Sequence, residues 1–349
     1  MSADDANTRP SKRARLSPEQ DSSALLASPS TPSLSNLKHH PEFWFDDGNI
    51  VLIAQHTGFR IFRTLLAAQS TVFADMFASS SSRSDETLDG CPVVHLTDSP
   101  NDLGHLLRIL LPTSPMCYIT ADPEVVHSFD EVFAVVRLAH KYGIQSVQDH
   151  AIRALQEYHF PSEINNFFGP PKKHIFVKSI HCIGAVNLAR LTDTPLMLPT
   201  ALYGCSYVSG RLLSGWTRED GTIEHLSTDD LKRCFDARIA LGQEQALLPA
   251  RLFSAVPPER CTSHRRCAPY IAKLVANVAV VEALVKKDAL CDLSSVISQL
   301  NGMCGGCTQV LLERHRVERK RIWDTLPQIF GIVIEGWAKP GGEGAGNAP

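Results

Sequence analysis

The spacing of hydrophobic residues changes from a strand pattern to a helix pattern after residue 62. Residues 50–55 are a short apolar run with β-branched side chains, and residues 59–62 have the composition of a second strand, so together they predict a hairpin. Residues 63–69 and 71–77 then carry apolar side chains at helical spacing. We expect two short helices to follow the hairpin directly.

The same reading continues to residue 158. Residues 93–96 predict a third strand, and Ser99 and Pro100 lie where a helix running to Leu111 should begin. A further helix should start at Ser128 and end at Gly143, a suitable C-terminal cap, and another should cover residues 146–158. Strands followed by helices predict an α+β domain over residues 39–161.

Helical patterns dominate residues 162–338, which we take as a second, mainly α-helical domain. Residues 175–191 form one amphipathic segment, and residues 228–241 form another. The second segment follows Ser227 and opens with Asp229 and Asp230, which favours a capped helix N-terminus. We also expect a long apolar helix between residues 267 and 304.

Composition and charge limit the functional classes. The chain has 349 residues, of which 44% are hydrophobic and 20% charged, and its formal charge is −3. These values fit two globular domains and leave no strong basic field, so we expect no direct binding of nucleic acid. The most apolar stretch, residues 274–285, is too short to cross a bilayer, and no apolar leader is visible. We therefore expect an intracellular protein of the nucleus, the cytoplasm or both, without a membrane partner.

The two ends of the chain differ from the rest. Residues 1–38 are rich in Ser and Pro and poor in large apolar side chains, so they predict a disordered tail, and residues 339–349 predict a second one. Lys12, Arg13 and Arg15 form a basic cluster that is typical of a nuclear import signal. The alternative is a solvated tail in which three basic residues are clustered by chance.

Several motifs between residues 43 and 160 occur together in the order of one known family. The order Asp47-Gly48-x-Ile50-Val51-Leu52, Phe59-Arg60-Ile61 and Leu65-Leu66-Ala67-x-x-Ser70-x-Val72-Phe73-x-x-Met76-Phe77 resembles a BTB/POZ domain, as does the later Leu138-Ala139-x-Lys141-Tyr142-Gly143. The whole chain is similar to a large group of fungal BTB proteins. This resemblance implies a short mixed sheet flanked by helices, a homodimer, a protein partner and a helical extension after the domain.

The resemblance also suggests an interaction surface. Asp47 and Arg63 match the positions of a charged pocket at the family's dimer groove; the alternative is an ion pair, or an Asp that caps a turn. Phe62 stands where the family commonly has His, so a function that uses that His is not expected. The aromatic residues Phe43 and Trp44, together with Phe45, would form a contact surface if they are exposed beside the first strand.

Four cysteines in the second domain have the chemistry of a metal site. Cys304 and Cys307 are separated by two glycines, and Cys261 and Cys267 lie upstream with five residues between them. Two such pairs could form a tetrahedral structural zinc site, in which His264 could replace Cys261 or Cys267. The alternative is four reduced thiols that pack as small hydrophobic residues.

No common catalytic motif is visible, and we expect no enzyme and no catalytic residue. The leading hypothesis is a self-associating interaction module that binds an unidentified protein. One alternative is a substrate adaptor of a cullin-based ubiquitin ligase, although the hydrophobic-x-Glu motif of such adaptors has no counterpart between Leu110 and Ile119. Another is a nuclear transcriptional co-regulator, which the basic cluster in the N-terminal tail favours.

Overall fold

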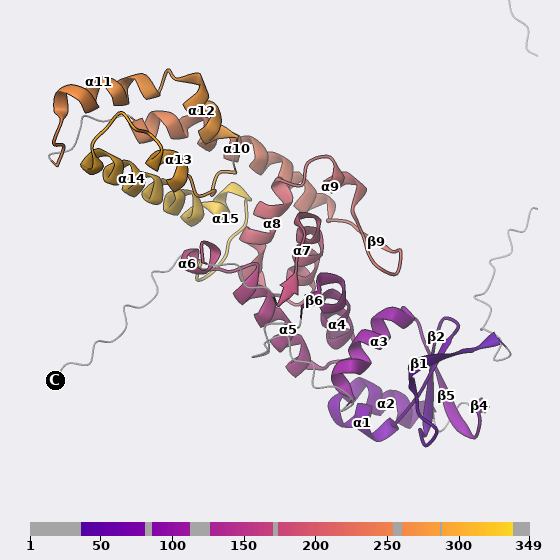
Figure 1. Cartoon of the computed structure of the whole chain (residues 1–349). Helices are drawn as coiled ribbons and strands as arrows, with labels where there is room; N and C mark the ends of the chain where they lie inside the picture. Colours follow the sequence, from indigo (N-terminus) through magenta and orange to yellow (C-terminus); the bar gives the residue numbers. More distant parts are fainter. Residues whose placement is uncertain are drawn as a thin grey trace, which may run out of the picture.

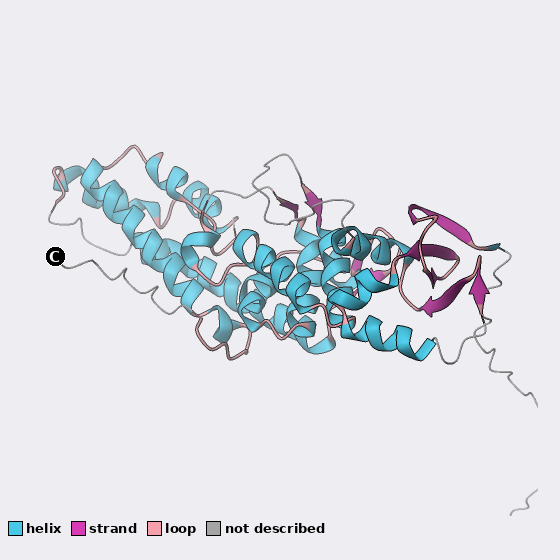
Figure 2. Cartoon of the chain, turned by 90° about the horizontal axis from the view of Figure 1, so that it is seen from below, coloured by secondary structure: helices cyan, strands magenta, loops and turns pink. Residues whose placement is uncertain are grey.

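The computed structural model describes residues 36–80, 86–111, 126–169, 174–253, 260–286 and 288–337. The predicted import signal and most of the predicted tails lie outside these residues. The molecule is elongated, with a β-sheet at one end and a group of helices at the other (Figures 1 and 2). Most strands belong to the first domain, and helices form nearly all of the remainder (Figure 2).

A five-stranded mixed sheet forms the end of the molecule that contains the first domain. Its order is β1-β3-β2-β5-β4, so β1 and β4 are the edge strands. β2 pairs with β3 in antiparallel fashion and with β5 in parallel, while β1 runs parallel to β3. The strands are β1 (Lys38–Trp44), β2 (Ile50–Ala54), β3 (Thr57–Ile61), β4 (Thr87–Leu88) and β5 (Cys91–Leu96). The expected hairpin is confirmed, with a tight turn at Gln55, whose φ of 53° lies in the left-handed region.

The helices of the first domain begin and end close to where their sequence signals predict. Ser128 is the N-cap of α4 and its hydroxyl accepts a hydrogen bond from the Glu131 N–H. The Ser70 hydroxyl accepts from the Phe73 N–H and donates to the Tyr142 carbonyl at 2.6 Å, which ties α2 to the end of α4. These helices are α1 (Arg63–Gln69), α2 (Thr71–Ser80), α3 (Pro100–Leu110), α4 (Phe129–Lys141) and α5 (Gln145–Tyr158).

The two faces of the sheet are buried by different partners. On one face the strands pack against the helices in a core that includes Phe59, Phe73 and Leu106. A small cluster of Val51, Ile53, Cys91 and Val93 belongs to the other side of the same strands. The alternation of side chains along β2 explains this division. The second cluster is covered by Leu37, Trp44 and Leu88, which come from β4 and from the chain around β1.

A second core joins α4 and α5 to the helical region that follows. Phe133 of α4, Leu155 of α5 and Trp216 of a short hairpin are all buried in it. The structure here differs from the single amphipathic segment expected over residues 175–191. Residues 175–176 form a short parallel pair with β6, and the helix begins only at Cys182. The elements are β6 (His127–Ser128), α6 (Ile164–Phe167), β7 (Ile175–Phe176), η2 (Ser179–His181), α7 (Cys182–Leu191), η3 (Pro195–Met197), α8 (Leu198–Ser206), α9 (Arg211–Ser214), β8 (Trp216–Thr217), β9 (Ile223–Glu224) and α15 (Leu326–Ile329).

Two long helices connect this core to a third one at the far end of the molecule (Figure 1). α10 (Thr228–Phe253) buries Leu241 in the second core and Leu252 in the third, so it continues well past the helix expected over residues 228–241. α14 (Gly305–Asp324) buries Leu311 in the third core and Trp323 in the second. The two helices are therefore antiparallel. Arg251 and Glu244 of α10 form ion pairs with Glu318 and Arg321 of α14.

We call residues 248–311, whose buried side chains form the third core, the C-terminal lobe. The single long apolar helix expected between the two cysteine pairs is wrong, because three short helices occupy this segment: α11 (His264–Leu274), α12 (Val278–Val285) and α13 (Ser294–Ser298). Asn277 interrupts the apolar run, and its side chain accepts a hydrogen bond from the Val280 N–H as the N-cap of α12. Among the described residues, no single helix is long and apolar enough to cross a membrane; α11 and α12 reach that length and hydropathy only together, with a bend of 64°.

Candidate functional site

The aromatic residues at the end of β1 do not share one environment. Phe43 is fully buried in the core beneath the sheet, next to Phe59. The expectation that Phe43 contributes to an exposed contact surface is therefore wrong, because the alternation along the strand turns its ring toward the helices. Trp44 points to the other side and is half-buried, with its ring stacked on His39 at 3.4 Å between centroids. Phe45 is also half-buried and stacks on Phe62.

Asp47 and Arg63 make separate contacts. Asp47 is exposed in the turn in which the Gly48 N–H donates to the Phe45 carbonyl. Arg63 is half-buried at the start of α1, where its guanidinium donates to the Phe77 carbonyl at 3.0 Å. No ion pair joins the two side chains in the described part of the chain. The ion-pair alternative is therefore excluded, whereas a charged pocket used by a partner stays a prediction.

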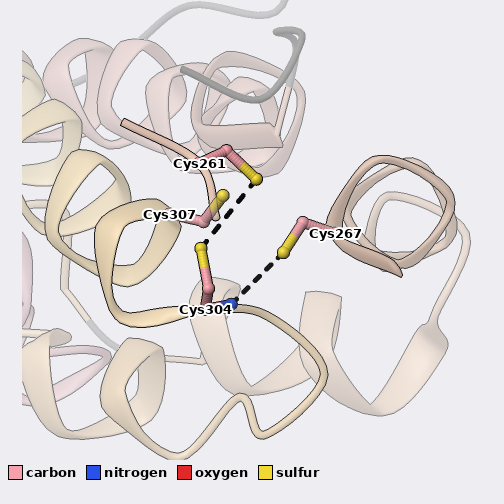
Figure 3. Close-up of side chains that lie close together, drawn as sticks. All are labelled: Cys261, Cys267, Cys304 and Cys307. Atoms are coloured by element: carbon pink, nitrogen blue, oxygen red, sulfur yellow. Dashed lines mark hydrogen bonds between the residues drawn. The ribbon is translucent and has the colours of Figure 1, made fainter. Parts of the chain in front are cut away.

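The four predicted cysteines converge in the C-terminal lobe (Figure 3). Cys261 lies in the loop before α11 and Cys267 in the first turns of that helix, while Cys304 is the N-cap of α14 and Cys307 lies in its first turn. Their sulfur atoms all lie within 4.8 Å of one another, and the Sγ atoms of Cys261 and Cys304 are 3.9 Å apart. Three of the side chains are buried and that of Cys304 is partly exposed.

Hydrogen-bond donors surround these sulfurs. The Cys304 N–H donates to the Cys267 Sγ at 3.2 Å. Donation from the Cys307 N–H, and then from the N–H and hydroxyl of Thr262, lowers the pKa of Cys304 to about 5. Burial has the opposite effect on two other members and raises the pKa of Cys267 and of Cys307. Cys304 is therefore the cysteine whose thiolate the surrounding donors stabilise most.

Two glycines allow the segments of this cluster to approach closely. A Cβ atom on Gly306 would lie 2.6 Å from the Arg260 carbonyl oxygen, and one on Gly302 would overlap the Tyr270 ring. Gly305 has open space at the same position. The glycines on both sides of Cys304 thus let α11 and the loop before it approach the start of α14.

His264 does not belong to the cluster. It is exposed at the first position of α11, and the group that could hold a metal ion consists of the four cysteines alone. The alternative in which His264 replaces Cys261 or Cys267 is therefore wrong. Cys267, Ile271 and Leu274 form the buried face of α11, whereas His264 at its first position faces solvent.

The structure contains a buried ion cluster that the sequence did not predict. Arg218, which follows β8, donates two hydrogen bonds to the Asp102 carboxylate of α3 and further ones to Asp130 at the start of α4. All three side chains are buried. Burial by itself would lower the pKa of the Arg218 guanidinium, but the hydrogen bonds and charges of the two carboxylates raise it. Asp102 and Arg218 are 116 positions apart, and no local pattern signals their contact.

Comparison with known families identifies the first domain. A family model described as the BTB/POZ domain matches residues 45–159. Residues 45–159 form a BTB/POZ domain. The expected architecture, a mixed sheet flanked by helices and followed by a mostly helical region, is confirmed. No curated protein matches the chain.

The match determines which predicted site residues belong to the BTB/POZ domain. It includes Phe45, Asp47 and Arg63, and it ends one residue after α5. Trp44 precedes its first residue, and the four cysteines lie beyond its last. Most of the segment between Leu110 and Ile119, where a cullin-binding motif would be sought, lies outside the described residues. The cysteine cluster is therefore a feature of the helical region and not of the BTB/POZ domain.

Proposed function

We propose that this chain is an intracellular interaction scaffold that self-associates through its BTB/POZ domain and presents its helical region to a further protein partner. The observation that carries this proposal is the BTB/POZ domain over residues 45–159, since such domains mediate protein-protein interaction and commonly self-associate. That the chain is not an enzyme stays a prediction of the sequence.

Two features at the edge of the five-stranded sheet support self-association. β1 is an edge strand of the sheet, and its residues Lys38 and His39 are exposed. An edge strand offers unpaired backbone groups to a strand from a second chain. Next to it, the half-buried rings of Trp44 and Phe45 offer apolar surface that a second copy could cover.

Light scattering coupled to size-exclusion chromatography, over a wide range of protein concentration, tests this proposal. We expect a dimer, and we expect Trp44→Arg and Phe45→Arg to shift the protein toward the monomer, because a charge would have to be buried in the interface. Phe176→Arg is the matched control, since Phe176 is an exposed aromatic residue that does not belong to the five-stranded sheet. A monomer at all concentrations, or variants that dimerise as well as the control, would contradict the proposal; circular dichroism checks that each variant is folded.

The cullin adaptor and the nuclear co-regulator stay predictions of the sequence alone. BTB/POZ domains are found in both kinds of protein, and no observation in the described residues favours one of them. Stable co-purification of a cullin with the full chain would select the adaptor.

A further inference from the structure

The distances within the four-cysteine cluster fit a single tetrahedral ion. With four metal–sulfur bonds of about 2.3 Å, neighbouring sulfur atoms in a zinc tetrahedron are roughly 3.8 Å apart. The Sγ atoms of Cys261 and Cys304 are 3.9 Å apart, and all four sulfurs lie within 4.8 Å of one another. A disulfide requires a separation near 2.05 Å, about half of that distance. A cluster of several irons, by contrast, would hold its cysteine sulfurs further apart than they lie here.

Several contacts around the cluster favour negative charge on the sulfurs, although burial opposes it at Cys267 and Cys307. The Cys304 N–H points at the Cys267 sulfur, and such donors to sulfur are the outer contacts that orient metal-bound cysteines. Cys267 and Cys307 each lie near the N-terminus of a helix, where the helix dipole favours negative charge. The Arg266 guanidinium donates to the Met303 carbonyl, next to Cys304, and so places a positive charge beside the cluster.

The position of the cluster indicates what a bound ion would do. Cys261, Cys267 and Cys307 are three of the thirteen buried residues that the structure describes in the third core. A core of this size contributes little stability by itself, and small folded units commonly depend on a metal or on disulfides. The ligands come from two ends of a segment of more than forty residues, so one ion would close the lobe between α11 and α14.

We propose that Cys261, Cys267, Cys304 and Cys307 bind one structural zinc ion that holds the C-terminal lobe together. Tetrahedral sites with four sulfur ligands are typical of zinc, and four protein ligands leave no open position for a substrate. The lobe lies at the end of the molecule opposite the sheet (Figure 1), so the ion acts separately from the BTB/POZ domain. A result that disproves the zinc site would therefore leave the proposed self-association untouched, and a result that disproves self-association would leave the zinc site untouched.

Native mass spectrometry of the full chain, purified in a reducing buffer without added metal, tests the stoichiometry. We expect one zinc ion per chain in the wild type, and its loss in a Cys304→Ser, Cys307→Ser double variant. Two controls should keep the ion: Cys291→Ser, whose thiol lies outside the cluster, and His264→Ala, whose ring lies outside it. Chains without metal, chains with iron, or loss of the ion in His264→Ala would each overturn the assignment.

Measurements on the wild-type chain keep the test valid if the double variant does not fold. Co²⁺ added to the chelated protein should give the intense visible absorption of a tetrahedral cobalt–thiolate site, and added Zn²⁺ should abolish it. Hydrogen exchange before and after chelation should show faster exchange in residues 260–311 and little change in residues 45–159. Absence of the cobalt spectrum, or unchanged exchange in the lobe after the metal is removed, would contradict the proposal.

Discussion

The guanidinium of Arg218 forms two hydrogen bonds with the carboxylate of Asp102, at 2.6 and 2.9 Å, inside the contact between the BTB/POZ domain and the helical region. Asp102 belongs to α3, whereas Arg218 follows β8, and the guanidinium also donates to Asp130 at the start of α4. The paired charges lie where water is excluded, so each one depends on the others for its stabilisation. This ion cluster connects two parts of the chain that no sequence motif relates.

Replacing Arg218 by Met should therefore destabilise the protein strongly. The variant leaves two buried carboxylates without their partner, for which we expect a loss of about 3–5 kcal/mol in the free energy of unfolding. Arg137→Met is the matched control, because Arg137 pairs with Glu224 at a half-exposed position and should cost less than about 1 kcal/mol. Urea unfolding followed by circular dichroism measures both variants. Equal losses in the free energy of unfolding would contradict the expectation that a buried ion pair costs more to break than a half-exposed one.

Replacement by alanine should affect the stability of the protein differently at two neighbouring glycines near Cys304. In Gly306→Ala the new methyl group would meet the Arg260 carbonyl oxygen, a backbone atom that cannot move away cheaply. We expect a loss of about 1–3 kcal/mol. Gly305→Ala meets nothing and replaces glycine at the first position of α14, so it should be neutral or stabilising by up to about 1 kcal/mol. Thermal unfolding of the two variants provides the comparison; a destabilised Gly305→Ala would contradict the open space at Gly305, and an unaffected Gly306→Ala would contradict the close approach of Arg260.

Stability should fall in mild acid because of two buried histidines. Burial, followed by the charge of Lys178, lowers the pKa of His181 to about 4, and burial, followed by the charge of Arg319, lowers that of His315 to about 4. An unfolded histidine titrates near pH 6.5, so between pH 6.5 and 4 the unfolded chain binds more protons than the folded one. The contribution is complete above pH 6.5 and is lost as the pH falls toward 4.

Each of these histidines should cost about 2 kcal/mol of stability at pH 5 relative to neutral pH. Urea unfolding at the two pH values measures this loss, and His181→Gln isolates one group because glutamine can still accept the hydrogen bond that the Lys178 N–H donates to the ring. The variant should lose about 2 kcal/mol less than the wild type on acidification. An unchanged pH dependence would mean that folding does not shift the pKa of His181.

Local sequence signals predicted those elements whose boundaries are determined by nearby residues. Ser128 caps α4 as expected, because its hydroxyl needs only the Glu131 N–H one turn away. The hairpin of β2 and β3 was predicted from the apolar run, but its turn lies at Gln55 and His56 and not at the expected residues 56–58. The motifs of the BTB/POZ domain could be recognised for the same reason.

Distant contacts decided the elements that differed from expectation. Residues 175–191 carry a helical pattern, but Ile175 pairs with His127 in a parallel bridge, and this long-range pairing replaces the first turns of the helix. α10 continues past Leu241 and through Pro249, because Leu248 and Leu252 bury their side chains in the third core. Helix propensity alone would not predict the second half of this helix.

The sequence by itself determined the BTB/POZ domain, the helical character of the rest and the four cysteines as candidate ligands, since each depends on residue types at short spacing. Only the tertiary structure decided that Cys261 and Cys267 meet Cys304 and Cys307, that His264 stays outside, and that Phe43 is buried. The two cysteine pairs are some forty residues apart, and no periodic pattern in the sequence shows that they meet. Their contact results from packing among helices that are far apart in the sequence. For the same reason Arg218 and Asp102 could be paired only in the folded protein.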